Sequence, residues 1–208
     1  LREAMGTPSS RFSQFAAGEE GNYQQLSRNI LQIENELYSP IRPKQPTQSM
    51  EKPTDALVKR GINYIEVRAL DVNPFSAIGI SESQFHFLDV FLLSCLLMPS
   101  EALDESQLTE AKDNMNKVVL EGRNTELKLL QGGEEISLPA WCETLFAQFK
   151  QVAALLDTAN ETDKYMAAVD EEWQKVIDPA KTPSGVLLNA LLKDDKDNSV
   201  FGLELAER

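Results

Sequence analysis

Two stretches of alternating residues decide the fold: residues 31–38, Leu-Gln-Ile-Glu-Asn-Glu-Leu-Tyr, and residues 64–71, Tyr-Ile-Glu-Val-Arg-Ala-Leu-Asp. Apolar and polar side chains alternate in both stretches. A period of two is typical of a β-strand that has one buried face and one polar face. The pattern therefore predicts strands over residues 29–38 and 62–70.

Proline and polar residues separate the two predicted strands. Pro40 and Pro43 are expected to end the first strand, because proline cannot donate a hydrogen bond to a neighbouring strand. The polar residues 45–54 are expected to form a loop. Two strands do not make a stable sheet by themselves, so we expect the rest of the sheet to come from chain that is absent here.

Helical periodicity replaces the alternation after residue 75. Ser81 followed by Gln84 forms a capping-box pattern, which predicts a helix over residues 81–98. Later patterns predict a helix over 100–120, a hairpin over 129–138 around Gly132-Gly133, helices over 139–156, 161–177 and 183–193, and a short final helix before residue 208. Strands followed by helices indicate an α+β fold. We expect residues 1–75 to form a strand-rich wall and residues 76–208 a helical region that packs on the sheet.

Charge excludes two broad classes of function. The 208 residues carry a net charge of −13, which argues against general binding to nucleic acid or to an anionic membrane. All of this acidity lies after residue 68, whereas residues 38–68 hold six basic and three acidic side chains. If the chain binds an anion, residues 38–68 are therefore the expected place.

The chain shows no membrane span and no disulfide pattern. The longest apolar run, residues 90–98, is about half of what a transmembrane helix needs. Cys95 and Cys142 are predicted to be reduced thiols of a cytoplasmic protein. Because the sequence begins at Leu1, we expect it to be part of a longer polypeptide.

Standard catalytic motifs are missing from the sequence. It has no phosphate-binding glycine loop of the usual types, no nucleophile elbow and no metal-ligand spacing of cysteine and histidine. The single histidine, His86, stands between two phenylalanines, and we interpret it as structural.

Glu66 and Arg68 carry the strongest chemical signal. They lie two residues apart on a predicted strand, so both side chains project from one face, next to Tyr64. A carboxylate beside a guanidinium suits a metal and phosphate site, because a hard cation prefers carboxylate oxygen and guanidinium matches phosphate. A cross-strand salt bridge on a solvated sheet face explains the same spacing. The two interpretations remain open for this pair, as they do for Glu34 and Glu36.

A family resemblance rests on these same residues. Residues 31–38, Pro40-Ile-Arg-Pro-Lys44, residues 64–71 and Asn73-Pro-Phe75 resemble the proteobacterial type of glutamate–cysteine ligase, as does Val118-Val-Leu-Glu-Gly-Arg123 further on. The resemblance covers most of the chain and corresponds to the carboxy-terminal portion of the family. It implies a fold similar to glutamine synthetase, with a curved antiparallel sheet surrounded by helices.

The resemblance also implies an activity and a set of site residues. The family joins the γ-carboxyl of L-glutamate to L-cysteine through a γ-glutamyl phosphate, with ATP and Mg²⁺, as the first step of glutathione synthesis. It implies that Glu66 is a magnesium ligand and that Arg68 contacts the phosphates. Tyr38 would line the cysteine pocket, and Arg42 and Lys44 are weaker candidates near the nucleotide.

The resemblance places the other metal ligands and the glutamate ligands in an amino-terminal half that this sequence does not contain. The 208 residues are therefore expected to be inactive alone, with the missing half of the enzyme as their partner. The alternative is a non-catalytic helical interaction module whose polar strand face is merely solvated. Under that alternative, the helices after residue 80 would bind a partner, and Arg68 would have no part in ATP binding.

Overall fold

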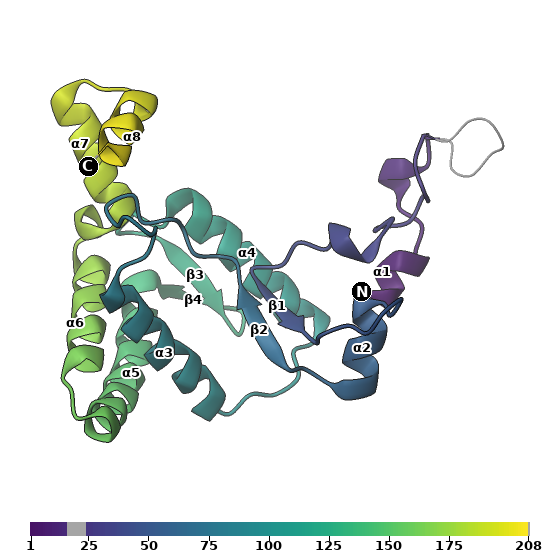
Figure 1. Ribbon diagram of the computed structural model, residues 1–208, viewed down its shortest axis with the longest axis horizontal. Coiled ribbons are helices and arrows are strands. Elements are labelled where there is room, and N and C mark those ends of the chain that lie inside the picture. Colours follow the sequence, from purple (N-terminus) through teal and green to yellow (C-terminus); the bar gives the residue numbers. More distant parts are fainter. Residues whose placement is uncertain (16–23, 208) are drawn as a thin grey trace. The chain divides into compact units, whose positions relative to one another are not determined.

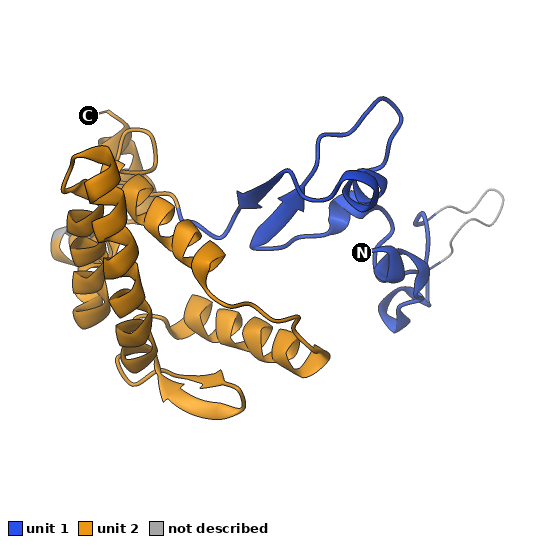
Figure 2. Ribbon diagram, turned by 90° about the horizontal axis from the view of Figure 1, so that it is seen from below, with its two compact units in different colours: residues 1–71 blue, residues 72–208 orange. Residues whose placement is uncertain are grey.

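The computed structural model describes residues 1–15 and 24–207, and its chain divides into two compact units, Leu1–Asp71 and Val72–Arg208 (Figure 2). The first unit contains short elements joined by loops. The second is mostly helical. Each unit is described by itself below.

The first unit is organised around one two-stranded antiparallel sheet. Its elements are α1 (Arg2–Gly6), the 3₁₀ turns Ser10–Phe12 and Glu34–Glu36, β1 (Ile41–Lys44), α2 (Pro53–Arg60) and β2 (Tyr64–Val67) (Figure 1). The register pairs Arg42 with Glu66 and Lys44 with Tyr64. β2 confirms the central part of the strand predicted over 62–70.

The strand predicted over residues 29–38 is wrong. This segment instead contains the 3₁₀ turn Glu34–Glu36. Its two glutamate carboxylates accept hydrogen bonds from backbone N–H groups instead of lying on the polar face of a strand. Glu34 Oε2 accepts from Thr54 N at 3.1 Å, and Glu36 Oε2 accepts from Gln32 N at 2.6 Å. Side chains that bond nearby backbone in this way compete with strand formation.

Two further expectations for the first unit need correction. Pro43 does not end a strand but lies inside β1. A two-stranded sheet tolerates a proline there, because each strand has one unpaired edge where the missing N–H costs no hydrogen bond. The segment expected to be a loop up to residue 54 passes into α2, which begins at Pro53. Proline suits the first turn of a helix, where its missing N–H has no intrahelical partner. At the other end of α2, Gly61 takes a positive φ of 74°.

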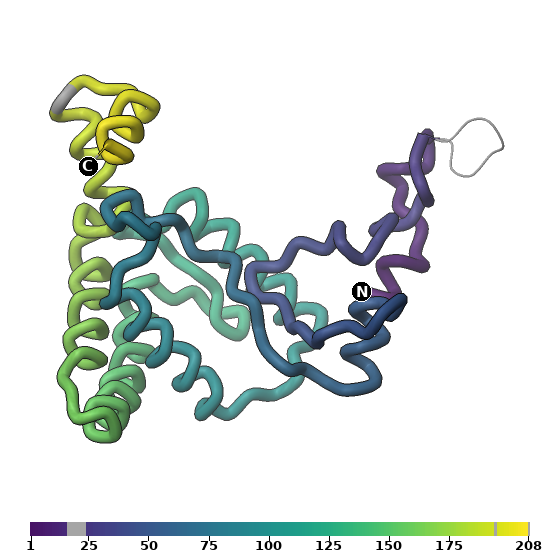
Figure 3. The backbone as a smooth tube through the Cα atoms, in the orientation of Figure 1, coloured from purple at the N-terminus to yellow at the C-terminus, as the bar shows by residue number. Residues whose placement is uncertain are grey.

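The second unit is built on three packed helices. Its elements are α3 (Glu82–Leu97), α4 (Glu105–Glu121), β3 (Lys128–Gln131), β4 (Glu134–Ser137), α5 (Leu138–Asn160), α6 (Lys164–Ile177), the 3₁₀ turn Pro179–Lys181, α7 (Pro183–Asp194) and α8 (Asn198–Ala206). α3, α5 and α6 contact one another (Figure 1). Between them lies a core of Val90, Phe146, Phe149, Val152, Ala153 and Val169. The backbone trace then continues from α6 through α7 to α8 at the carboxy-terminal end (Figure 3).

Local capping signals place these helices well. Ser81 and Gln84 form the predicted capping box at the start of α3, with Ser81 Oγ accepting from Gln84 N at 3.2 Å. α4 starts later than the predicted residue 100, because Asp104 and Gln107 form a second capping box there. Within the described residues, no helix is long and apolar enough to cross a membrane.

The predicted hairpin is confirmed and is attached to α4. Gly132 and Gly133, with φ of 63° and 85°, form its turn, a backbone conformation that favours glycine. Their two N–H groups donate to the carboxylate of Glu110 at 2.9 and 2.8 Å. Asn114 is buried and bonds both backbone groups of Leu130, donating to its carbonyl at 2.6 Å and accepting from its N–H at 2.9 Å.

Candidate active site

The polar face of the β1–β2 sheet brings together four of the five predicted site residues, all except Tyr38. Directly opposed residues of an antiparallel pair share a face, as do residues two apart on one strand. The register therefore places Arg42 and Lys44 of β1 on the same face as Tyr64 and Glu66 of β2. Arg68, which follows β2, joins them through its side chain and donates its N–H to the carbonyl of Pro40 at 2.7 Å.

Glu66 occupies the centre of this polar face. Its Oε1 accepts a hydrogen bond from Arg68 Nη2 at 3.3 Å, and its Oε2 lies 3.4 Å from Lys44 Nζ. The Arg68 guanidinium, helped by the Lys44 ammonium, lowers the pKa of the Glu66 carboxyl against the opposing effect of desolvation. Glu66 is therefore ionised at neutral pH.

The second oxygen of this carboxylate is unusual. Glu66 Oε2 is buried yet accepts no hydrogen bond, although the ammonium of Lys44 is near. The Lys44 ammonium offsets the charge of this oxygen without a hydrogen bond to it, and a hard cation such as Mg²⁺ is a suitable partner for a carboxylate oxygen. The observation fits one metal ligand at this position.

The surrounding charge favours an anion beside that carboxylate. Arg42, Lys44 and Arg68 place three cationic groups on the face, against the single carboxylate of Glu66. Lys44 and Arg68 keep about a third of their side chains exposed, so their donors can reach a ligand. Guanidinium and ammonium groups in such a cluster suit phosphate oxygens.

Tyr38 is not joined to this cluster by any interaction within the described residues. It lies three residues before β1 with 73% of its surface exposed. Its predicted role in a cysteine pocket stays a prediction. Glu34 and Glu36, which the sequence left open as metal ligands, bind backbone amides instead.

The described residues do not form a complete metal site. Across residues 1–15 and 24–207, no group of three or more histidine, cysteine, aspartate or glutamate residues is arranged to hold an ion. Glu66 could therefore supply one ligand, and further ligands would have to come from elsewhere.

The histidine and the two cysteines lie in surroundings that suit a structural role. The His86 ring packs edge-on against Tyr165 with ring centres 4.7 Å apart and lies 3.5 Å from Glu82 Oε1, as expected for a residue that joins α3 to α6. Cys95 and Cys142 are free, and burial raises the pKa of both thiols. Raised pKa values make them poor nucleophiles at neutral pH.

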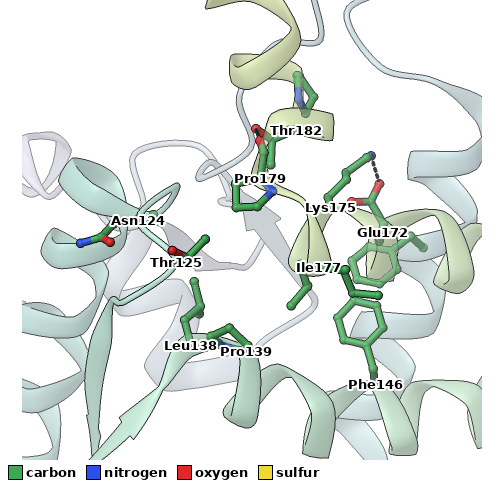
Figure 4. A pocket seen from close by; sticks show the side chains of 14 residues that line it. Asn124, Thr125, Leu138, Pro139, Phe146, Glu172, Lys175, Ile177, Pro179 and Thr182 are labelled. Carbon is green, nitrogen blue, oxygen red and sulfur yellow. Dashed lines mark hydrogen bonds and ion pairs between the residues drawn. The ribbon is translucent and has the colours of Figure 1, made fainter.

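A cavity of about 450 Å³ lies in the second unit, and none of the predicted site residues lines it (Figure 4). Its wall is largely apolar, with Leu138, Phe146 and Ile177 among the residues that line it. The ion pair between Lys175 and Glu172, at 2.5 Å, supplies its charged edge. Sequence reasoning missed this cavity, because it forms where helix ends meet and no local motif marks it.

Comparison with known proteins decides the family. Residues 1–118 match the family model described as glutamate–cysteine ligase. The chain belongs to the glutamate–cysteine ligase family. Two curated ligases of that name match nearly the whole chain: the one from Shewanella halifaxensis is 47% identical over 209 residues, and one from Vibrio vulnificus is 44% identical over 207 residues. The chain spans about 40% of the length of each of these relatives.

Solved structures support the same assignment. The glutamate–cysteine ligase of Francisella tularensis in complex with AMP matches 99% of this chain and 41% of its own, with a TM-score of 0.85 and 33% identity. A bifunctional glutathione synthetase from Pasteurella multocida matches 84% of this chain and 21% of its own, with a TM-score of 0.62 and 24% identity, which shows likeness of fold alone. The resemblance and the α+β fold class of the ligase family are thus confirmed.

Proposed function

We propose that this chain forms one wall of the active site of an ATP-dependent ligase that joins the γ-carboxyl of L-glutamate to the amine of L-cysteine. Membership of the glutamate–cysteine ligase family and the AMP bound to the Francisella relative support it. The observation that carries the proposal is the buried Glu66 Oε2, which accepts no hydrogen bond and belongs to a carboxylate with two cationic neighbours, Lys44 and Arg68. Residues 1–75 would supply this wall, and residues 76–208 the supporting helical region.

Each charged residue has a proposed role in phosphoryl transfer. Glu66 would be one ligand of Mg²⁺, which when bound would neutralise charge on the phosphates of ATP. Arg68 would orient the phosphoryl oxygens and stabilise charge that develops during transfer, with Arg42 and Lys44 as additional contacts to the nucleotide. Tyr38 would line the cysteine pocket.

The chemistry requires two steps and exclusion of water. Glutamate's γ-carboxylate would take the γ-phosphoryl group of ATP, giving γ-glutamyl phosphate and ADP. The cysteine amine would then attack the activated carbonyl carbon and form the amide C–N bond, while the bond between that carbon and the phosphate oxygen breaks, inorganic phosphate leaves and the amine nitrogen loses a proton. Because water would hydrolyse the acyl phosphate, the site has to be closed during both steps. The first step needs neutralisation of phosphate charge, which suits the cationic face around Glu66.

The experiment is a substitution in the full-length ligase. We expect Glu66→Gln to reduce turnover by about 10²-fold or more, as is typical when a group that stabilises transition-state charge is lost. Glu135→Gln is the matched control, because Glu135 also stands on an antiparallel strand in an ion pair, with Lys128 at 3.1 Å. Near-normal turnover of Glu66→Gln, with Glu135→Gln also active, would refute the metal role.

One other candidate is a non-catalytic interaction module whose polar β1–β2 face is merely solvated. The ion pairs of Glu66 with Lys44 and Arg68 favour it, because they partner this carboxylate without any ligand. That candidate predicts that Arg68→Ala leaves ATP affinity of the full-length protein unchanged, whereas the ligase proposal predicts weaker ATP binding. We also propose that the 208 residues alone are inactive and that the enzyme is cytoplasmic. ADP release dependent on glutamate and cysteine by the purified 208-residue chain would contradict the inactivity.

A further inference from the structure

The two oxygens of Glu66 have different partners. Oε1 accepts a hydrogen bond from the planar guanidinium of Arg68, which is two residues along the chain. Oε2 accepts none, and its nearest cationic group is the ammonium of Lys44, across the sheet at 3.4 Å. Arg68 and Lys44 therefore hold the same carboxylate through separate atoms.

The contact with Lys44 is the weaker of the two in kind. Both contacts are longer than the about 2.7–2.9 Å of a strong charge-assisted hydrogen bond, at 3.3 Å for Arg68 and 3.4 Å for Lys44, but only the Arg68 contact has hydrogen-bond geometry. The Lys44 side chain is 32% exposed and carries its ammonium at the end of a flexible four-carbon stem. The ammonium can therefore move away from Glu66 without movement of the strand. Ion pairs of this exposure contribute little and are easily exchanged.

We propose that Lys44 is a positioning residue that neutralises Glu66 Oε2 while no divalent cation is bound, and that the cation displaces it from that oxygen. This rests on the proposed function, since it requires Glu66 to bind the cation. A cation such as Mg²⁺ approaches its oxygen ligand to about 2.0–2.1 Å, and repulsion between its double positive charge and a nearby ammonium disfavours both on the same oxygen. The released ammonium then becomes available to an anionic group such as a nucleotide phosphate.

Exchange of this kind couples two binding events. Lys44 competes with the divalent cation, so it weakens cation binding in the absence of nucleotide. Once displaced, it adds a free positive charge to the face that already holds Arg42 and Arg68. Cation binding would therefore strengthen nucleotide binding, and by thermodynamic linkage nucleotide binding would strengthen cation binding by the same factor.

The first test measures Mn²⁺ binding to the full-length ligase by electron paramagnetic resonance, without nucleotide. We expect Lys44→Met to tighten Mn²⁺ binding by about two- to five-fold, the range set by a partly exposed ion pair. Arg42→Met is the matched control. It removes the same charge from the same face, at the position opposite Glu66, and in the described part of the chain Arg42 makes no ion pair with that carboxylate. The control should change Mn²⁺ affinity by less.

The second test uses the unmodified full-length ligase, so it does not depend on a variant that folds. An amine-acylating reagent and mass spectrometry measure the labelling rate of Lys44, with the exposed Lys52 as internal reference. Addition of Mg²⁺ should raise the labelling rate of Lys44 relative to Lys52 by about two-fold or more. The expected change is small because the ion pair between Lys44 and Glu66 that Mg²⁺ breaks is weak. Subsequent addition of ADP should lower it again.

The outcomes separate this inference from the proposed function. If Lys44→Met changes Mn²⁺ affinity no more than Arg42→Met, or if Mg²⁺ leaves Lys44 labelling unchanged, the exchange is refuted. Glu66→Gln decides whether the proposed function fails too. Weaker Mn²⁺ binding in Glu66→Gln keeps the metal role of Glu66 and removes only the exchange, whereas unchanged binding removes both.

Discussion

Asn114 makes the attachment of the β3–β4 hairpin to α4 directly measurable. Its side chain is 8% exposed and bonds both the N–H and the carbonyl of Leu130. Substitution Asn114→Ala removes both hydrogen bonds and leaves two backbone groups of a half-buried residue with only partial access to water. At about 1 kcal/mol for each bond, plus part of the cost of unpaired groups, the loss is about 2–3 kcal/mol.

Helix propensity acts in the opposite direction. Alanine is the better helix former than asparagine by about 0.6 kcal/mol, so the net loss in free energy of unfolding should be about 1.5–2.5 kcal/mol. Asn116→Ala is the matched control, because Asn116 lies exposed on α4 two residues away. It carries the same gain in propensity without the two bonds, so it should be neutral or slightly stabilising.

The assay is urea unfolding of the 208-residue chain followed by tryptophan fluorescence. The two tryptophans, Trp141 and Trp173, lie in α5 and α6, so the signal reports on the second unit. The difference between the two alanine variants isolates the hydrogen bonds from helix propensity. If the variants differ by less than about 0.5 kcal/mol, the bonds to Leu130 contribute nothing net and the reasoning fails.

Two further perturbations test the core and the first unit. Phe149→Ala, which removes a ring that is 3% exposed in the helical core, should lower the free energy of unfolding by about 3–5 kcal/mol, against less than about 1 kcal/mol for Leu155→Ala on the exposed side of α5. Equal fluorescence-monitored losses would contradict the assigned core. Arg60, with Gln48 N–H and Lys59, lowers the pKa of Glu51 to about 2, so Glu51 stabilises the fold above its ordinary pKa near 4.5 and loses that effect as pH falls toward 2. The stability difference between the natural chain and Glu51→Gln, followed by circular dichroism, should shrink over that range; a difference independent of pH would show that the ion pair is not its source.

Local signals predicted most of the second unit. Ser81 and Gln84 are three residues apart and close their capping box without help from distant chain, and Gly132 and Gly133 supply the positive φ that a tight hairpin needs. Such features are readable because every group involved lies within a few residues. α4 starts later than the predicted residue 100, because its cap is Asp104, which forms a capping box with Gln107.

Long-range partners explain the failure over residues 29–38. Alternation is necessary for a half-buried strand but does not supply a neighbour, and here Glu34 bonds the amide of Thr54, 20 residues away. The same dependence limits the site. Glu66 and Arg68 are neighbours by spacing alone, whereas the contact of Lys44 with Glu66 Oε2 depends on the register of β1, a strand whose prolines argued against it.

Pro43 has a consequence for self-association of the isolated chain. The carbonyls of Pro40 and Lys44 accept hydrogen bonds from Arg68 and Asn63, so alternate residues of β1 point their backbone toward β2. Pro43 therefore faces the outer edge, where it offers a ring and no N–H. A free strand edge is a template for pairing between molecules, and an interrupted row of donors protects against it. Pro43→Ala should thus leave the β1–β2 register intact while making this edge more prone to aggregation.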